Sequence, residues 1–419
     1  MPWFNFKKFI GITLMGLSIS SIALAHTTSP LILSQLIATA SQHNPQIKSA
    51  YDRWLAMKRV APQVRSLPDP KLIYSDMQMS GNPEMNQNPL HEKMLGLDQE
   101  VPFPGKLIER GKIANIESER TYAEYVVTKL TIIAQLKRIF YDLYFVNQSI
   151  EIYQKNQLLL EKIEKSVRTN YSVGKIPQQD IFRAQTEISR LQMRLVMLKQ
   201  ERTSLQADIN RLLNRSLATP IETPSHLSIT PLHFDLQYFN NLIEKQSPQL
   251  KSQWKNVKKS EKAITLSKMD YVPDIDISYG EVHDTEMHTS GYQLMASASI
   301  PLYFFSKQNN MVRESEENYN ADIENLYVTH NNLLFQIKNA YLMSKRSEEL
   351  IQLIQHSIIP QATLTFSSGQ ASYGVGKVDF LTLLNNLLML QDNELELQKE
   401  IVQHEKAMTD IEEVTGINL

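Results

Sequence analysis

The sequence predicts a mainly α-helical protein with a small β part, built from long antiparallel coiled-coil helices and four short strands. Three observations lead to this prediction: an internal repeat, an apolar seam with coiled-coil spacing, and two pairs of short alternating segments. The chain has 419 residues, a formal net charge of -2 and no cysteine. Disulfides and thiolate metal ligands are therefore excluded. Nothing in this composition indicates a nucleic-acid partner.

The N-terminal residues indicate an exported protein. Lys7 and Lys8 precede an apolar run of about 14 residues, and Ala23-Leu24-Ala25 supplies a small-residue cleavage pattern. We therefore predict a signal peptide at residues 1–25. An uncleaved anchor is the alternative, but the run falls short of the about 20 apolar residues that span a bilayer. No later stretch is apolar enough for a membrane helix, so a crossing after export would have to use strands.

The mature chain consists of two copies of one unit. Pro45-Gln46-Ile47-Lys48-Ser49 returns as Pro248-Gln249-Leu250-Lys251-Ser252, and Tyr171-Ser172-Val173-Gly174-Lys175 returns as Tyr373-Gly374-Val375-Gly376-Lys377. The offset stays near about 200 residues, which marks a structural repeat. We expect a first repeat at 26–220, a linker or equatorial segment at 221–236, and a second repeat at 237–419.

Each repeat has the same predicted order: a helical segment, a β-hairpin, a very long helix and a medium helix. The predicted ranges are 32–66, 70–101, 106–172 and 177–213 in the first repeat, and 237–269, 273–301, 305–372 and 377–412 in the second. At 1.5 Å per residue, the long helices reach roughly 100 Å, more than a compact globule requires. Pro360 lies inside the second long helix, where it predicts a bend or the boundary between two helices.

The medium helix of the first repeat carries a coiled-coil seam. Its apolar residues recur at alternating steps of three and four, with polar and charged residues on both flanks. Only Arg202 interrupts the pattern. The seam consists of Ile181, Ala184, Ile188, Leu191, Leu195, Leu198, Leu205, Ile209 and Leu212.

The hairpin segments alternate between apolar and polar residues, as transmembrane strands do. In the second repeat, Ile275, Ile277 and Tyr279 alternate with acidic and hydroxyl residues, and Tyr292 to Ile300 repeats the pattern. The first-repeat strands, Lys71 to Met79 and Lys93 to Val101, alternate less cleanly. Four strands cannot close a membrane barrel, because the smallest need about eight. The hairpins are therefore surface decoration, or several chains contribute strands to one shared barrel. The internal repeat and the long predicted helices favour a shared barrel.

Several short motifs, in the same order in both halves, resemble those of the TolC-like outer-membrane efflux proteins over nearly the whole mature chain. Tyr171-x-x-Gly174 followed by Asp180, Ile181, Phe182 and Ala184 resembles that family's turn-and-helix signature. Ile359-Pro360-Gln361-Ala362 leading to Tyr373-x-x-Gly376 resembles the second-repeat version. Leu67-Pro68-Asp69-Pro70 and Gln99-Glu100-Val101-Pro102-Phe103-Pro104-Gly105-Lys106 resemble the heavy-metal cation efflux branch.

The resemblance implies a homotrimer in the outer membrane of a Gram-negative bacterium, extending into the periplasm. Each chain would contribute four transmembrane strands to a 12-stranded barrel in contact with outer-membrane lipid, and helices to a periplasmic helical barrel. The implied function is a passive exit duct without catalytic activity or cofactors. Its implied partners are a periplasmic adaptor protein and an inner-membrane pump of the RND type, with metal cations as the expected cargo. A multidrug or type I secretion duct, and a periplasmic coiled-coil scaffold, are the alternatives.

The two helical turns are the predicted adaptor-contact tips. Tyr171, Gly174 and Lys175 belong to the first tip and Tyr373, Gly376 and Lys377 to the second, each glycine permitting a left-handed backbone. Ordinary helix C-caps are the simpler interpretation. The resemblance further implies adaptor docking at these turns, with the glycines allowing close helix approach.

Two acidic residues are predicted at the periplasmic entrance. Asp180 matches the acidic position just past the tip in the family, where three copies would attract cations and raise an apparent pKa. In the second repeat Thr382 takes the equivalent place and Asp379 lies three residues earlier, so this entrance departs from the pattern. An Asp at the start of a helix can also act only on the helix dipole.

The predicted hairpin loops contain thioether and imidazole groups that suit soft metal ions, but they show no ordered ligand spacing. We therefore predict no metal site there. The chain also lacks HExxH, P-loop and nucleophile-elbow motifs, which argues against an enzyme. The loop residues concerned are Met77, Met79, Met85, His91, His283, Met287 and His288.

Overall fold

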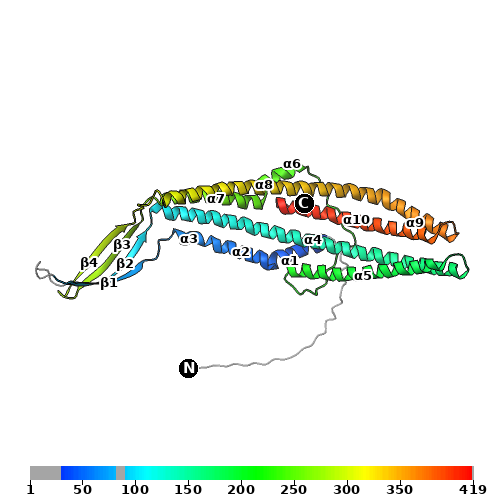
Figure 1. The fold of residues 1–419 in the computed structure, drawn as a ribbon, viewed down its shortest axis with the longest axis horizontal. Coiled ribbons are helices and arrows are strands. Elements are labelled where there is room, and N and C mark those ends of the chain that lie inside the picture. The colour runs from blue at the N-terminus through cyan, green and yellow to red at the C-terminus, as the bar shows by residue number, and fades with distance from the viewer. Residues whose placement is uncertain (1–29, 82–89, 418–419) are drawn as a thin grey trace, which may run out of the picture.

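The structure is a computed structural model that describes residues 30–81 and 90–417. The chain forms one elongated body with a small sheet at one end, two helical turns at the other, and long helices side by side between them (Figure 1). The predicted signal peptide at 1–25 lies outside the described residues. The mainly helical fold with a small antiparallel sheet confirms the predicted fold class.

The elements follow the order expected of two repeats. Three helices, two strands, a very long helix and a medium helix are followed by two helices, two strands, a long helical rod and a final helix. Their bounds are α1 Pro30–His43, α2 Pro45–Lys58, α3 Val60–Arg65, β1 Lys71–Met79, β2 Leu90–Val101, α4 Pro104–Ser172, α5 Gln178–Leu212, α6 Leu236–Gln246, α7 Pro248–Met269, β3 Ile275–Asp284, β4 Thr289–Ala298, α8 Gln308–Leu353, η2 Ile354–Ile358, α9 Ile359–Gly374 and α10 Phe380–Thr415.

The first helical segment of each repeat is interrupted at a proline. In the first repeat Asn44 caps α2, its side chain accepting hydrogen bonds from the N–H groups of Gln46 and Ile47, and Pro45 occupies the first turn. In the second repeat Pro248 opens α7 after Ser247. Proline fits the first turn, where its missing N–H has no intrahelical partner, and it disfavours helix in the residue before it. The breaks therefore follow from local chemistry.

Pro360 does not end the second long rod. A π-helical turn at Ile354–Ile358 precedes it, and α9 continues directly from Ile359. Proline lacks an N–H and its ring clashes with the carbonyl four residues earlier, which here belongs to His356. The wider π turn includes this carbonyl, so the rod stays helical through the proline.

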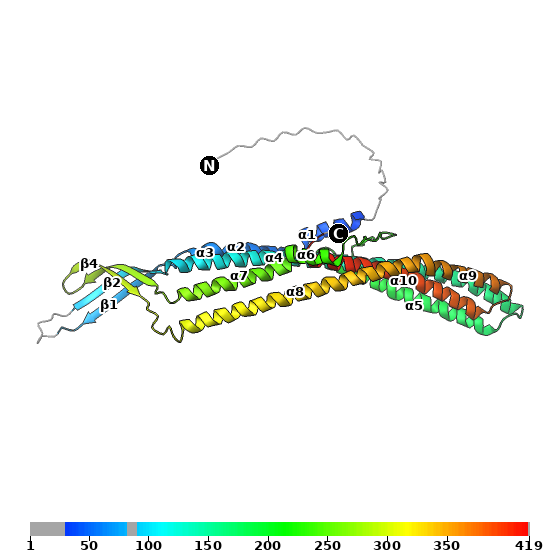
Figure 2. The ribbon, with the colours of Figure 1, turned by 90° about the horizontal axis from the view of Figure 1, so that it is seen from above.

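The long helix α4 is the centre of the helical body. It packs against α2 and α3 and against α5 in its own repeat, and against α7 and α10 of the second repeat. Helix α8 in turn packs against α7 and α10. Viewed from above, α1 and α6 lie on one side of these rods, near the middle of the body (Figure 2). The shorter helices thus pack alongside two long rods, α4 in the first half of the chain and α8–η2–α9 in the second.

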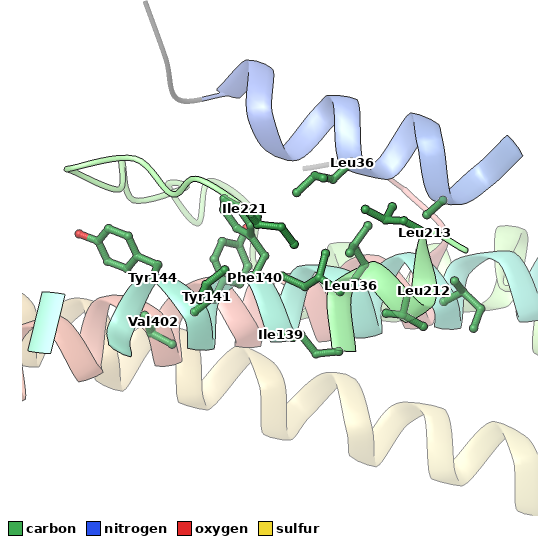
Figure 3. Close-up of a cluster of buried hydrophobic side chains, with 14 of the residues drawn as sticks. Leu36, Leu136, Ile139, Phe140, Tyr141, Tyr144, Leu212, Leu213, Ile221 and Val402 are labelled. Atoms are coloured by element: carbon green, nitrogen blue, oxygen red, sulfur yellow. The ribbon is translucent and has the colours of Figure 1, made fainter. Parts of the chain in front are cut away.

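The seam of α5 is buried against α4 over most of its length. Ile181, Ala184, Leu191, Leu195 and Leu198 are buried, as are Ile209 and Leu212, which confirms the predicted coiled-coil face. Near the middle of the body, Leu36 of α1 faces Leu136 and Phe140 of α4 (Figure 3). Fully burying such side chains contributes about 1.5–3 kcal/mol each, so this cluster holds α1 on the rods.

The four strands form one antiparallel sheet in the order β1-β2-β3-β4. The two hairpins are joined through β2 and β3, whose register pairs Gly96 with Gly280 and Leu97 with Tyr279. Strands β1 and β4 are the edges: among the described residues, β1 pairs only with β2 and β4 pairs only with β3. The sheet therefore ends in two open edges.

Candidate functional site: an exposed apolar sheet face and two helical tips

One face of the sheet is apolar and exposed. The register places Tyr279 opposite Leu294 and Ile277 opposite Ala296, so the apolar positions of neighbouring strands lie on the same face. Tyr292 is 76% exposed and Leu294 71%. An exposed apolar surface of this kind marks contact with a membrane or another protein. The same face also carries Asp76, Lys93 and His283 toward the hairpin ends, and Glu281 between Leu95 and Tyr292. Its apolar members are Leu72, Tyr74, Leu95, Leu97, Val101, Ile275, Ile277, Tyr279, Tyr292, Leu294, Ala296 and Ala298.

The opposite face of the sheet carries most of the polar residues of the strands. Their alternation with the apolar set follows from the two-residue period of a strand. This polar face includes Asp98 and Glu100 of β2. Its polar members are Lys71, Ser75, Glu92, Asp98, Glu100, Asp276, Ser278, Asp284, Gln293 and Ser297.

Bulky side chains gather where the sheet meets the long helix α8. Leu302, Tyr303, Phe304 and Phe305 follow β4, and all four are largely exposed. Aromatic residues collect in this way at the edges of apolar membrane bands, where an amphipathic ring contacts both lipid and water. The predicted start of the second long helix at 305 falls in this segment, whereas α8 begins at Gln308.

The far end of the body consists of the two predicted tips. At the first tip, the N–H of Gly174 donates to the carbonyl of Tyr171 at 2.9 Å, and that of Lys175 to the carbonyl of Asn170 at 3.0 Å. These two bonds form a Schellman motif, which satisfies the last carbonyls of α4. Gly174 has a φ of +73°, the left-handed conformation that glycine adopts without steric cost.

The second tip repeats this geometry. The N–H of Gly376, at a φ of +74°, donates to the carbonyl of Tyr373, and that of Lys377 donates to Ser372. The two tips differ in their tyrosines, because Tyr171 is exposed and Tyr373 is buried. A Cβ added to either left-handed glycine would meet no atom of the chain within 4 Å. Within one chain, these glycines therefore serve the turn and not helix packing.

The two predicted entrance carboxylates lie in one electrostatic neighbourhood, and the charge of Arg183 acts on both. Burial raises the pKa of Asp180 and the charge of Asp379 raises it further, while Arg183 opposes both effects. The pKa of Asp379 is lowered, chiefly by its hydrogen bonds with Thr382 and also by Arg183. The tertiary structure thus brings together the acidic residues of the two repeats, and Arg183 is a neighbour that sequence reasoning missed.

The two carboxylates have different local roles. Asp379 is the N-cap of α10, and its side chain accepts a hydrogen bond from the N–H of Thr382 at 2.8 Å. The corresponding N-cap of α5 is Pro177, which has no capping side chain, and Asp180 lies in the first turn. Helix capping therefore accounts for Asp379. Asp180 instead affects the buried Tyr373: burial raises the pKa of the tyrosine hydroxyl, and the charge of Asp180 raises it further.

Asp180→Asn should raise the melting temperature of the protein at pH 7. The pKa of Asp180 is raised above its ordinary value of 3.8 in the folded protein, so its ionised form destabilises the fold. This loss of folding stability appears as the pH rises through the unfolded and folded pKa values. Asn has the same shape and no charge, and the gain should vanish near pH 3, where Asp180 is protonated. Thermal unfolding of both proteins at the two pH values checks this; an equal gain at both would contradict it.

In the described part of the chain, histidines of both hairpins make polar contacts within the sheet. No group of three or more His, Asp or Glu side chains with metal-binding spacing occurs there. His91 instead pairs with Asp76 at 2.8 Å, and His283 lies 2.9 Å from the hydroxyl of Ser290. Met85 lies outside the described residues.

Lys106, the last residue of one family-like motif, ties the two repeats together below the sheet. Its ammonium group lies 2.9 Å from Asp274 and 3.4 Å from Asp270, and its side chain is 4% exposed. Asp274 also accepts a hydrogen bond from the N–H of Phe103. This buried ion pair joins the start of α4 to the connection between α7 and β3.

A buried polar cluster contains the serine, histidine and acidic residue of a hydrolase triad, but its serine is closed to solvent. The hydroxyl of Ser344 lies 3.1 Å from Nε2 of His404, whose Nδ1 lies 3.3 Å from Glu405. All three residues are at least nine-tenths buried, so no substrate reaches the serine. Glu405 accepts two hydrogen bonds from Thr230 and thereby holds the linker between the repeats on α10. No local sequence pattern predicts this cluster.

Among the described residues, no helix has both the length and the apolar character that crossing a bilayer demands.

Residues 240–411 match the family model of the outer membrane efflux proteins. The comparison with curated proteins finds no match. The matched family comprises channels and not enzymes, in agreement with the prediction that this chain has no enzymatic activity.

Solved structures resemble the chain over nearly all of its length. The outer membrane protein VceC of Vibrio cholerae shares 16% identity, with a TM-score of 0.79 over 92% of this chain and 96% of that one. The Campylobacter jejuni CmeC outer membrane channel shares 11% identity, with a TM-score of 0.79 over 98% and 94%. The Neisseria gonorrhoeae MtrE outer membrane channel shares 13%, with a TM-score of 0.76 over 92% and 89%. At such identities the likeness establishes the fold. Residues 240–411 thus resemble the outer membrane efflux proteins, and the chain as a whole has the fold of these outer-membrane channels.

Proposed function

We propose that the protein is the outer-membrane exit duct of a tripartite efflux system and works as a homotrimer. The observation that carries this proposal is the exposed apolar face of a sheet with two open edges. In lipid every backbone N–H and C=O must be paired, so β1 and β4 need partners there. Pairing β4 of one chain with β1 of the next in a trimer gives a closed barrel of twelve strands, above the minimum of about eight.

The polar face of the sheet would then line the channel and the apolar face would contact outer-membrane lipid. The helices, extending away from the sheet, would reach through the periplasm and end at the two tips (Figure 1). The family match supports this orientation. Such a duct is passive, because energy comes from an inner-membrane pump joined to it through a periplasmic adaptor.

We propose that the adaptor docks at the two tips, on Tyr171, Gly174 and Lys175 and on Tyr373, Gly376 and Lys377. Both tips carry an exposed lysine next to a glycine around which the chain leaves open space. The matching Schellman turns would present similar surfaces to repeated adaptor subunits. Asp180 and Asp379 would then lie at the channel entrance, where three copies of each favour the passage of cations.

Metal cations are the cargo, and an RND pump the partner, that we propose for this duct. The support is the family-like motifs Leu67 to Pro70 and Gln99 to Lys106. Deleting the gene should increase sensitivity to divalent and soft metal ions while leaving tolerance to dyes and antibiotics unchanged. The reverse pattern would favour a multidrug duct, and loss of a secreted protein would favour a type I secretion duct.

Leu294→Arg should remove the protein from the outer membrane. Leu294 is on the exposed apolar face, where an arginine in the middle of the bilayer costs about 2–4 kcal/mol. In a trimer this cost occurs three times. Membrane fractionation with native mass measurement should show little trimer, and planar-bilayer recordings should show few channels.

Gln293→Arg is the matched control, because Gln293 is the neighbouring residue on the polar face. This variant should assemble normally and shift the conductance or ion selectivity of the channel. If Leu294→Arg and Gln293→Arg assemble equally well, the apolar face does not contact lipid. A soluble, non-conducting wild-type protein would support the periplasmic scaffold instead.

A further inference from the structure

A large cavity lies in the helical body, away from the sheet and the tips. Its volume is about 1040 Å³, at the upper end of the range typical of small-molecule sites. Helices α2 and α4 of the first repeat and α6 and α7 of the second repeat all contribute side chains to it. Its lining includes Trp54, Lys58, Ser118, Glu119, Tyr122, Glu244, Leu250, Lys251, Trp254 and Lys255.

Aromatic side chains from three helices form the apolar part of the cavity. The rings of Trp54 on α2 and Tyr122 on α4 pack with their centroids 4.9 Å apart. Trp254 on α7 is 45% exposed despite its size. Large aromatic rings left accessible in a concave surface offer stacking area to a flat apolar ligand.

Lysines surround these rings. The ammonium group of Lys258 lies 3.7 Å from the ring centroid of Trp254, and that of Lys58 lies 5.7 Å from the centroid of Trp54. Lys255 forms an ion pair with Glu119. Lys251 has no ion pair among the described residues, and it lines the cavity beside the aromatic rings.

We infer that this cavity binds an aromatic organic anion. The flat body of such a ligand would pack against Trp54, Tyr122 and Trp254, and its acidic group would meet Lys251 and Lys58. An organic cation would also stack on the rings, but once the Lys255–Glu119 ion pair is set aside it would face two lining lysines, Lys58 and Lys251, against one glutamate, Glu244. The site joins both repeats, because Trp54 and Tyr122 belong to the first and Glu244 and Trp254 to the second.

The tryptophans provide a direct readout. The whole chain has three, Trp3, Trp54 and Trp254. Trp3 lies within the predicted signal peptide, and the other two line the cavity. With Trp3 absent or replaced by Phe, the intrinsic tryptophan fluorescence therefore reports on the cavity alone.

The test titrates the full-length, detergent-solubilised protein with naphthalene-2-sulfonate and follows tryptophan quenching. Naphthalene-2-sulfonamide and a naphthylmethylammonium salt carry the same ring with no charge and with a positive charge. Saturable quenching is expected for the sulfonate, with an affinity about tenfold above that of the ammonium salt, as a charge-assisted contact provides. Non-saturable quenching, or equal affinities for the three probes, would overturn the inference.

Lys251→Met separates charge from packing. It keeps most of the aliphatic stem, so sulfonate binding should weaken about five- to tenfold while sulfonamide binding stays unchanged. Lys165→Met removes an exposed lysine of α4 outside the cavity lining, and it should leave both affinities unchanged. Equal sulfonate affinities in Lys251→Met and Lys165→Met would contradict the assigned role. Trp254→Ala, with Trp54 as the remaining reporter, should weaken the binding of all three probes.

Discussion

Gly280→Val should prevent the two hairpins from joining into one sheet. A Cβ at Gly280 would lie 2.7 Å from the carbonyl oxygen of Leu95 and 2.8 Å from the Cα of Gly96. These are backbone atoms of the facing strand, so no side-chain rotation relieves the contact. The strands must separate, and backbone groups left unpaired in lipid cost several kcal/mol each. The amount of trimer recovered from outer membranes should therefore fall at least about tenfold.

Gly291→Val is the control for this prediction. Gly291 lies in β4 of the same sheet, and a Cβ added there meets no atom within 4 Å. Valine is also favoured in strands, so this variant should assemble like the wild type. Wild-type trimer yields for Gly280→Val would show that the close approach of Gly96 and Gly280 is not required.

The double variant Gly174→Val with Gly376→Val should disrupt both tips without unfolding the body. Each glycine has a positive φ, where a β-branched residue is strained by roughly 1–2 kcal/mol. The strain is confined to turns at the end of the body opposite the sheet, far from the core cluster around α1 (Figure 1). Hydrogen exchange should increase at both tips, and on the proposed function adaptor pull-down and export should both be lost.

Gly374→Val provides an adjacent control. Gly374 is the last residue of α9, is not among the residues with positive φ, and leaves open space around an added Cβ. This variant should keep hydrogen-exchange protection at the tips, adaptor pull-down and export. If the double variant behaves like Gly374→Val in all three measurements, neither the left-handed turns nor adaptor docking at the tips depends on these glycines.

Much of the architecture follows from local periodicity in the sequence. The a/d spacing from Ile181 to Leu212 specifies the buried face of α5, because side chains that recur every 3.5 residues lie on one side of a helix. Alternation from Ile275 to Tyr279 likewise separates the two faces of β3. Pro45 and Pro248 mark helix starts, because the first turn accepts a proline without losing an intrahelical hydrogen bond.

Contacts between distant segments could not be predicted in this way. Nothing local indicates that Gly96 faces Gly280, that Asp180 lies near Asp379, or that His404 meets Ser344. The same holds for the cavity that Trp54 and Trp254 share. Each of these pairs joins elements that are far apart in the chain.

The sequence by itself predicted the repeat, and it determined the faces of the helices and strands and the left-handed glycine turns. These depend on bond geometry and side-chain spacing within a few residues. Only the tertiary structure decided the order of the strands, the shared neighbourhood of the entrance carboxylates and the aromatic cavity. The packing of α4 between the two repeats fixes which surfaces meet, and that packing is a property of the whole chain.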